Sequence, residues 1–373
     1  MREWQDEQTG RTVRQLTDNA AGTELGYFRV PRRLPDGRVL AQRRGKPRTL
    51  VALDIETGAQ QVFDQLRGWP LGLREADGRY WFCHEREVYA ADLPDGIPQK
   101  IGELPPDTPL RMPTISCDGQ TLITGIYTID SDEEYVLPST PDPAVFWRWV
   151  DRPRHGHLQA YNLQDGISRM VVALEKLMPI HTDASPTDSG LLKFAHDGFD
   201  AHCQRIWTVR TDGSGLTPIR VQEYGEMITH EFWWPGGQSI AYKFQDRRND
   251  STVHDLPWAE YAPVATRFGL ANLRGEEYYL SDPLNHYHSH INVSPDGKML
   301  CGEGTDGHSF LYAAAFSPHN TRIEFLPHAS THTPYQPFVG QNVNSSFSHD
   351  SQWIAFNDTI EGTMQVCAVR VEL

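Results

Sequence analysis

Short runs of apolar residues follow turn signals along nearly the whole chain. Asp-Gly and Gly-Gly pairs between extended runs are typical of hairpin turns, because glycine adopts a positive φ without steric cost. Seven such turns recur, at spacings of 41 to 70 residues: Pro35–Arg38, Ala76–Arg79, Cys117–Gln120, Thr187–Gly190, Pro235–Gln238, Pro295–Lys298 and His349–Gln352. These spacings are near or above that of one four-stranded propeller blade. The pattern therefore predicts an all-β fold, a seven-bladed β-propeller.

Both ends of the chain also alternate in the manner of strands, over Arg11–Thr17 and over 364–371. Propellers commonly pair strands from the two ends in one blade, which removes exposed sheet edges. We expect the ring to close in this way, with one domain over residues 1–373.

Two stretches interrupt the repeat, near 127–157 and near 247–283. The second carries the pattern of a short helix at Trp258–Tyr261. Long ordered insertions are often lids or binding loops, although decoration of the outer rim explains them equally well.

Composition narrows the classes of function. The formal net charge of −15 argues against nucleic-acid binding, which needs clustered Lys and Arg. The N-terminal residues are polar without an apolar signal core, and no apolar stretch approaches a membrane span. Five scattered cysteines without CxxC spacing favour a reducing compartment. We expect a cytoplasmic protein with no membrane partner.

Histidine is the main candidate for chemistry, with sixteen residues, several of them near turns. The chain has no Walker loop and no GxSxG elbow. The segment His230–Trp234 begins like the HExxH zinc motif, but Trp234 stands where the second histidine must be. This disfavours zinc-protease chemistry.

The densest group is His286, His288 and His290. In an extended strand these side chains point to one face, and neighbours two apart are close enough for two of them to share a metal. A hydrated strand end with surface histidines is the alternative.

A second group precedes the last turn and contains His328, His332, Gln341, Asn342 and Asn344. Nitrogen and oxygen donors from two blades would suit a divalent metal such as Mn²⁺. Buried asparagines that cap backbone groups are an equally weighted alternative.

A third group spans the fourth and fifth repeats. His196 is followed by Arg205–Trp207 and then by Thr229–Trp233. Taken alone, His230 beside aromatic residues is more often structural than catalytic, and Arg205 could be a surface charge.

In Arg205–Trp207, Thr229–Trp233 and the segment from His290 to Gly304, the chain resembles the oligogalacturonate lyases of polysaccharide lyase family 22. The resemblance implies a seven-bladed propeller with Mn²⁺ in its central cleft. It also implies β-elimination of short oligogalacturonides inside the cell, in pectin degradation. Carried over, His230 is the catalytic base, Arg205 binds substrate and His290 is the first metal-ligand histidine.

The rest of the implied metal site departs from the family pattern. Asn342 and Asn344 stand where that pattern has two histidines, and Val339 is nearest its glutamine. His332, Gln341, His288 or His308 completes the site, or the metal is different, weakly held or absent.

From these arguments we assign the candidate residues. His230 and Arg205 are catalytic, and His196, Arg205 and Trp233 contact the substrate. The metal ligands are His290, His332, Gln341, Asn342 and Asn344. The expected cofactor is a divalent metal, Mn²⁺ first and Ca²⁺ second.

The sequence therefore predicts a lyase that cleaves short uronic-acid oligosaccharides, with oligogalacturonate as the first substrate and another uronide as the second. The chemistry agrees, because removal of the C5 proton requires a base and neutralisation of the adjacent carboxylate. The alternative is a non-catalytic propeller that binds a sugar or a protein. A propeller lactonase ranks last, because no turn motif gathers the carboxylates of a calcium site.

Overall fold

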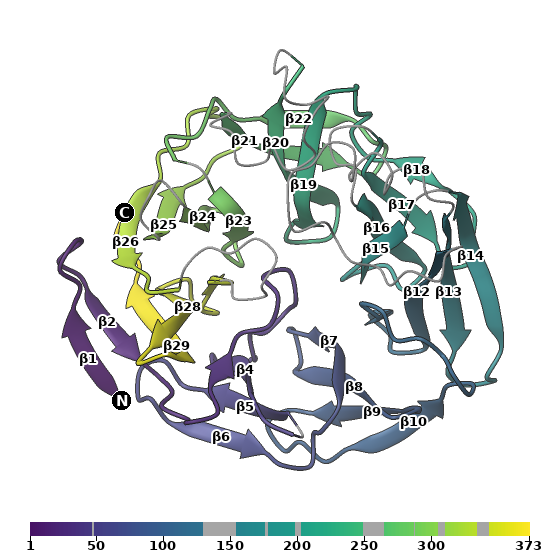
Figure 1. The fold of residues 1–373 in the computed structure, drawn as a ribbon, viewed down its shortest axis with the longest axis horizontal. Helices are drawn as coiled ribbons and strands as arrows, with labels where there is room; N and C mark the ends of the chain where they lie inside the picture. The colour runs from purple at the N-terminus through teal and green to yellow at the C-terminus, as the bar shows by residue number, and fades with distance from the viewer. Residues whose placement is uncertain are drawn as a thin grey trace. The chain divides into compact units, whose positions relative to one another are not determined.

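The structure is a computed structural model that describes residues 1–46, 48–129, 154–175, 178–197, 203–248, 265–286, 288–304, 310–333 and 343–373. Over these residues the chain is all-β, without a helix, and its strands form seven antiparallel sheets (Figure 1). Contacts divide the chain into two compact units. Unit 1 contains Met1–Ile101 and Ser281–Leu373, and unit 2 contains Gly102–Leu280.

Unit 1 holds four sheets. One contains β3 (Thr23–Glu24), β4 (Val39–Arg43), β5 (Thr49–Leu53) and β6 (Gln60–Phe63). The next contains β7 (Trp69–Arg74), β8 (Arg79–His84), β9 (Glu87–Asp92) and β10 (Gln99–Glu103). Another contains β23 (His288–Val293), β24 (Met299–Gly304), β25 (Phe310–Ala315) and β26 (Leu326–Ser330). The fourth joins β1 (Arg2–Gln5) and β2 (Thr12–Gln15) to β27 (Ser346–Phe347), β28 (Trp353–Ile360) and β29 (Thr363–Arg370).

Unit 2 holds three sheets of four strands. The first contains β11 (Thr114–Ile115), β12 (Thr121–Ile129), β13 (Arg154–Asn162) and β14 (Ser168–Glu175). The second contains β15 (Met178–Ala184), β16 (Leu191–Asp197), β17 (Ile206–Arg210) and β18 (Thr217–Pro218). The third contains β19 (Glu226–Trp233), β20 (Ser239–Asp246), β21 (Thr266–Asn272) and β22 (Glu277–Leu280).

All seven predicted turns lie where the sequence places them, each leading into one of β4, β8, β12, β16, β20, β24 and β28. A serine braces some of these turns. Ser294 donates its hydroxyl to Asp296 at 2.7 Å and accepts from the backbone N of Met299 at 2.9 Å. Gly297 between them has a φ of 74°, which only glycine adopts without strain. The turn chemistry read from the sequence is therefore confirmed.

The sheet that closes the chain confirms the predicted pairing of its two ends. β2 runs antiparallel to β29, with Val13 opposite Val369 and Gln15 opposite Cys367. β1 extends this sheet as a further strand beside β2. The pairing matters because it covers the free edge of β29.

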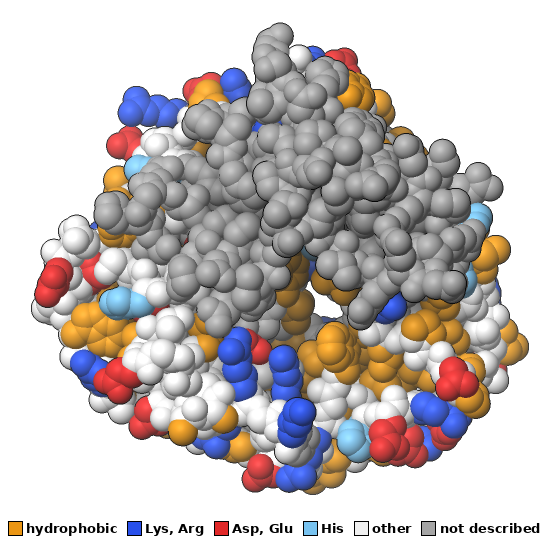
Figure 2. Space-filling model, viewed as in Figure 1, with side chains coloured by type: hydrophobic (Ala, Val, Ile, Leu, Met, Phe, Trp, Pro, Cys, Tyr) orange, Lys and Arg blue, Asp and Glu red, His pale blue; other side chains and the backbone are white. Residues whose placement is uncertain are grey.

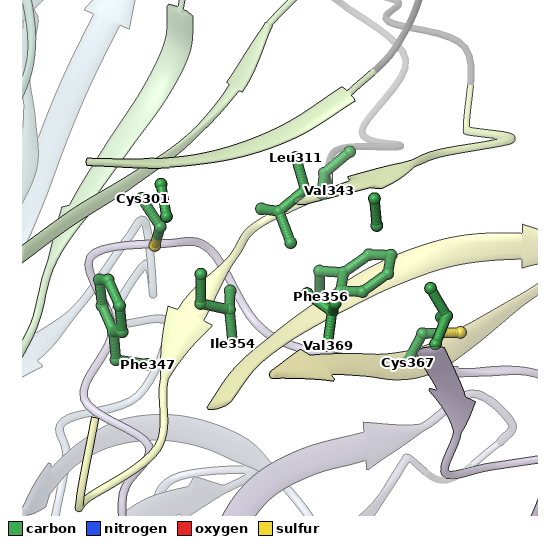
Figure 3. Close-up of a cluster of buried hydrophobic side chains, with 11 residues drawn as sticks. Cys301, Leu311, Val343, Phe347, Ile354, Phe356, Cys367 and Val369 are labelled. Atoms are coloured by element: carbon green, nitrogen blue, oxygen red, sulfur yellow. The ribbon is translucent and has the colours of Figure 1, made fainter. Parts of the chain in front are cut away.

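Buried apolar side chains fill the space between neighbouring sheets. Figure 3 shows the cluster between the β23–β26 sheet and the closing sheet, where Leu311 and Cys301 face Phe347, Ile354 and Phe356. The full cluster is Val13, Cys301, Leu311, Ala313, Ala329, Val343, Phe347, Ile354, Phe356, Cys367 and Val369. Comparable clusters join the sheets of unit 2. Each sheet is thus stabilised mainly by burial against its neighbour.

The first predicted insertion falls largely outside the described residues, and the second does so in part. The first interrupts the β12–β13 hairpin, whose last described pair is Ile129 opposite Arg154. The second is narrower than expected, because β21 and β22 occupy Thr266–Asn272 and Glu277–Leu280. The helix expected at Trp258–Tyr261 lies outside the described residues. The single domain over 1–373 stays a prediction.

The surface carries a local basic region despite the acidic net charge. Figure 2 shows Lys and Arg side chains together over β4 and the β4–β5 connection. Arg44 and Arg48 in this connection both pair with Glu24.

No helix in the described ranges is long and apolar enough to cross a membrane.

Candidate active site

A buried ion pair lies at the centre of the candidate catalytic residues in unit 2. Arg205, just before β17, donates from Nε to Oε2 of Glu231 in β19 at 2.8 Å. Their side chains are 2% and 0% exposed. A buried carboxylate is expensive unless paired, so each partner holds the other in place.

A β-bulge in β19 sets the direction of His230 and Glu231. The register passes from Thr229 opposite Lys243 to Phe232 opposite Ala241, so two residues oppose one. His230 has a φ of 55°, which is uncommon outside glycine. Its Nδ1 lies 3.4 Å from the hydroxyl of Thr229. Strained backbone of this kind is often found at functional sites.

β15 carries a second bulge with the same pattern. Its register passes from Ile180 opposite Ala195 to Asp183 opposite Lys193, and His181 at the start of the bulge has a φ of 52°. Nδ1 of His181 lies 3.8 Å from Oε1 of Glu231. Glu231 therefore lies within ion-pair distance of both Arg205 and His181.

A buried lysine completes this cluster of charges. Lys193, fully buried in β16, pairs with Asp183 at 2.6 Å and donates to the carbonyl of His181 at 3.4 Å. Burial by itself would raise the pKa of Glu231, but the positive charges of Arg205, Lys193 and His181 outweigh it and lower the pKa to about 2. Glu231 is therefore an anion at neutral pH.

His196 and Trp233 lie beside this cluster in supporting positions. Nδ1 of His196 is 3.0 Å from the carbonyl of Gln204, so this nitrogen carries the proton. The ring packs against Phe194 and Trp207. Burial lowers the pKa of His196 to about 4, which makes it neutral at pH 7. Trp233 lies 3.4 Å from the carbonyl of Asp183 through Nε1 and thereby links β19 to β15.

The predicted metal ligand His290 lies in unit 1, in a third bulge. β23 passes from His288 opposite Gly304 to Ile291 opposite Gly302. This shift places His290 on the face of Glu303, and Nδ1 of His290 is hydrogen-bonded to Glu303. The rings of Tyr27 and Phe28 contact the imidazole at centroid distances of 5.3 and 4.7 Å.

The same bulge corrects one expectation. The three histidines of 286–290 do not share one face. His286 and His288 pack on Tyr312, at 4.5 and 5.3 Å, and His288 also lies 3.9 Å from the Phe325 ring. Only His290 of the three turns to Glu303, because the bulge reverses the alternation after His288.

Asn344 joins the His290 group through its backbone. Its N–H donates to Oε2 of Glu303 at 2.8 Å, and its carbonyl accepts from Arg32 at 3.2 Å. The side-chain Oδ1 of Asn344 is buried and has no hydrogen-bond partner among the described residues. An imidazole and an unsatisfied carbonyl oxygen are donors that suit a cation of the Mn²⁺ type, with Glu303 orienting the imidazole.

Among the described residues, His332 is the one further predicted ligand, and it lies in a different group. His332 contacts the buried carboxylate of Asp358 instead, with its Nδ1 2.9 Å from Oδ2. Gln341 and Asn342 lie outside the described residues, as does His308. Within the described ranges, no three His, Cys, Asp or Glu side chains form a metal site.

The sequence alone did not single out several members of these groups. Glu231 stands out in the sequence only as part of a motif, and no motif marks His181, Lys193 or Glu303 as a functional residue. One signal could have found His181. It lies three residues before the end of β15, as His230 lies three residues before the end of β19.

Two curated relatives match the chain over part of its length. The oligogalacturonate lyase of Dickeya dadantii is 36% identical over 63 residues, which are 17% of this chain and 16% of that protein. The oligogalacturonide lyase of Pectobacterium atrosepticum is 24% identical over 205 residues, which are 49% of this chain and 47% of that protein. The chain thus spans about half the length of these relatives at most. No protein-family model matches it.

Two solved structures match the whole chain. An oligogalacturonate lyase in complex with manganese has a TM-score of 0.75 at 20% identity. An oligogalacturonate lyase from Vibrio parahaemolyticus has a TM-score of 0.76 at 19% identity. Each match covers 100% of this chain and 96% of the other. With the seven sheets described above, these matches confirm the fold class predicted from the turns. The chain is a seven-bladed β-propeller that resembles the oligogalacturonate lyases in sequence and in fold.

Proposed function

We propose that this protein is a lyase that cleaves short uronic-acid oligosaccharides by β-elimination, with oligogalacturonate as its first substrate. One observation carries the proposal furthest: the buried Arg205–Glu231 pair lies beside His230 on a strained bulge. The names of the similar proteins support the same substrate class.

The reaction assigns a role to each residue of this group. Elimination removes the C5 proton of a uronide, which is weakly acidic even beside the carboxylate. Neutral imidazole suits this step near pH 7, so His230 takes the proton. Arg205 binds the uronate carboxylate through its terminal nitrogens while its Nε stays with Glu231, and it thereby favours the enolate-like intermediate.

A divalent metal, Mn²⁺ first, belongs to the proposal through His290 and Asn344. When bound, such a metal would supply positive charge that stabilises a carboxylate. Glu303 fixes His290 through Nδ1 and so presents Nε2 to a ligand. Sequence alone supports two further parts of the proposal. His332, Gln341 and Asn342 are proposed as additional metal ligands, and His196 and Trp233 as substrate contacts.

The test follows the ultraviolet absorbance of the new C4–C5 double bond with digalacturonate, trigalacturonate and other short uronides. Asparagine tolerates positive φ, so His230→Asn removes the base without adding backbone strain. We expect its turnover to fall by about 100- to 10,000-fold. The matched control is the exposed His319→Asn, which should keep full activity.

The outcomes separate the candidate functions. Full activity in a folded His230→Asn variant would remove His230 from the mechanism. Turnover of another uronide alone would keep the reaction and change the substrate. If the folded wild-type protein eliminates none of the uronides, the non-catalytic propeller that binds a sugar or a protein replaces the lyase.

A further inference from the structure

Two histidines occupy equivalent positions in adjacent sheets of unit 2. His181 and His230 each begin a two-residue bulge in the first strand of a sheet, with φ values of 52° and 55°. They are the two histidines among the described non-glycine residues with positive φ. Left-handed backbone is unfavourable for residues with a Cβ atom, and its repetition at two histidines is typical of a functional site.

Glu231 connects the two histidines. It follows His230 directly in the chain, and its Oε1 lies 3.8 Å from Nδ1 of His181. A carboxylate on the Nδ1 side orients an imidazole so that Nε2 points away from it. Arg205 holds the other carboxylate oxygen at 2.8 Å, which fixes the position of Glu231.

From this geometry we propose that His181 is a second catalytic residue, the acid that protonates the leaving oxygen. The inference rests on the proposed lyase function. β-Elimination needs one group to accept a proton and another to give one, and the equivalent bulges supply two imidazoles flanking one carboxylate.

His230 takes the C5 proton, the C4–O bond breaks, and the electron pair of the C5–H bond forms the C4–C5 double bond. The imidazolium of His181 gives its proton to the departing O4. His230 ends protonated and His181 neutral, and exchange with water restores both.

The charges around His181 come from three strands and from the residue that precedes β17. Glu231 in β19 favours the imidazolium form, and Asp183 in β15 adds a second carboxylate nearby. Lys193 in β16 and Arg205 before β17 oppose it, although each is paired with one of these carboxylates, at 2.6 and 2.8 Å. The two carboxylates offset the two cations, so His181 meets no net positive charge, and its Nδ1 lies 3.8 Å from Oε1 of Glu231.

The test compares two leaving groups in the full chain. In digalacturonate the leaving group is the second sugar, which departs as an alkoxide through O4 and needs a proton, whereas a galacturonate 4-O-(2,4-dinitrophenyl) ether releases a stable phenolate that does not. We expect His181→Asn to lose about 100-fold or more of kcat on digalacturonate and less than about 5-fold on the ether. His230→Asn should be slow on both, because both need the C5 proton removed.

Controls keep the result interpretable. Asp107→Asn places asparagine at an exposed position that also has a positive φ (60°) and should change neither rate. Thermal unfolding checks that each variant is folded. Equal losses on both substrates, or no loss on either, would overturn the role of His181. Absence of turnover by the wild-type protein on both substrates would instead overturn the lyase function itself.

Discussion

Arg205 and Glu231 form an ion pair in which neither side chain is more than 2% exposed. Each charge stabilises the other in such a deeply buried pair, because either charge alone would strongly destabilise the folded state. The same carboxylate faces His181, so the pair links the stability of unit 2 to its proposed chemistry.

Neutralising one partner of this pair should destabilise the protein. Glu231→Gln leaves the Arg205 charge buried and uncompensated, which costs about 3–5 kcal/mol in comparable pairs. Urea unfolding measures the change in free energy. The matched control is Glu223→Gln, because Glu223 pairs with Arg248 at the surface and such pairs contribute about 0–1 kcal/mol. Equal effects of the two substitutions would contradict the burial argument.

The low pKa of Glu231 predicts a loss of stability in acid. Its pKa is about 2 in the folded protein and near 4.5 when unfolded, so the unfolded state binds a proton first as the pH falls. The contribution of Glu231 is present above about pH 4.5 and is lost as the pH falls to about 2. The difference in unfolding free energy between wild type and Glu231→Gln should therefore shrink over this window. A difference that stays constant with pH would mean that the neighbouring positive charges do not stabilise the ionised form of Glu231.

The low pKa of His196 predicts a second loss of stability, over a higher pH range than that of Glu231. Burial lowers its pKa from 6.5 to about 4. Between these pH values His196 is therefore protonated in the unfolded state and neutral in the folded state. Stability should fall by up to about 3 kcal/mol as the pH drops from 6.5 to 4. His196→Asn keeps a donor toward the carbonyl of Gln204 but does not titrate. Urea unfolding of the wild type and the variant at pH 6.5 and pH 4 measures the contribution of His196 to the change in unfolding free energy. The same pH dependence in both proteins would contradict this prediction.

Metal binding can be measured without turnover. Electron paramagnetic resonance of free Mn²⁺ should show uptake by the wild-type protein. His290→Gln should weaken uptake strongly, and Glu303→Gln should weaken it about 10- to 100-fold through loss of the orienting hydrogen bond. His319→Gln serves as the exposed control. Unchanged Mn²⁺ affinity in His290→Gln would place the metal elsewhere or remove it from the proposal.

The closing sheet predicts that an aspartate destabilises the protein to very different extents at two adjacent positions of β2. Val13 is 1% exposed and packs into the cluster of Figure 3, whereas Thr12 is exposed. Val13→Asp buries a charge without a partner and should cost several kcal/mol, while Thr12→Asp should cost less than about 1 kcal/mol. Thermal unfolding of both variants tests the pairing of β2 with β29. Similar unfolding temperatures would contradict it.

Local chemistry in the sequence was sufficient for much of this fold. A Ser-x-Asp-Gly turn such as Ser294–Gly297 is specified by its own residues, because the bonds that hold it join neighbours in the chain. The alternation in β2 and β29 was likewise enough to predict their pairing. The resemblance to known lyases in Arg205–Trp207 and Thr229–Trp233 pointed to the protein class.

The tertiary structure decided how the candidate residues are grouped. The three bulges depend on which strand lies alongside, so no local pattern predicted that His290 would turn to Glu303 while His288 packs on Phe325. Glu231 became central only through Arg205, 26 residues earlier in the chain. A register shift of one residue reverses the face of every side chain beyond it, and that shift is set by partners distant in sequence.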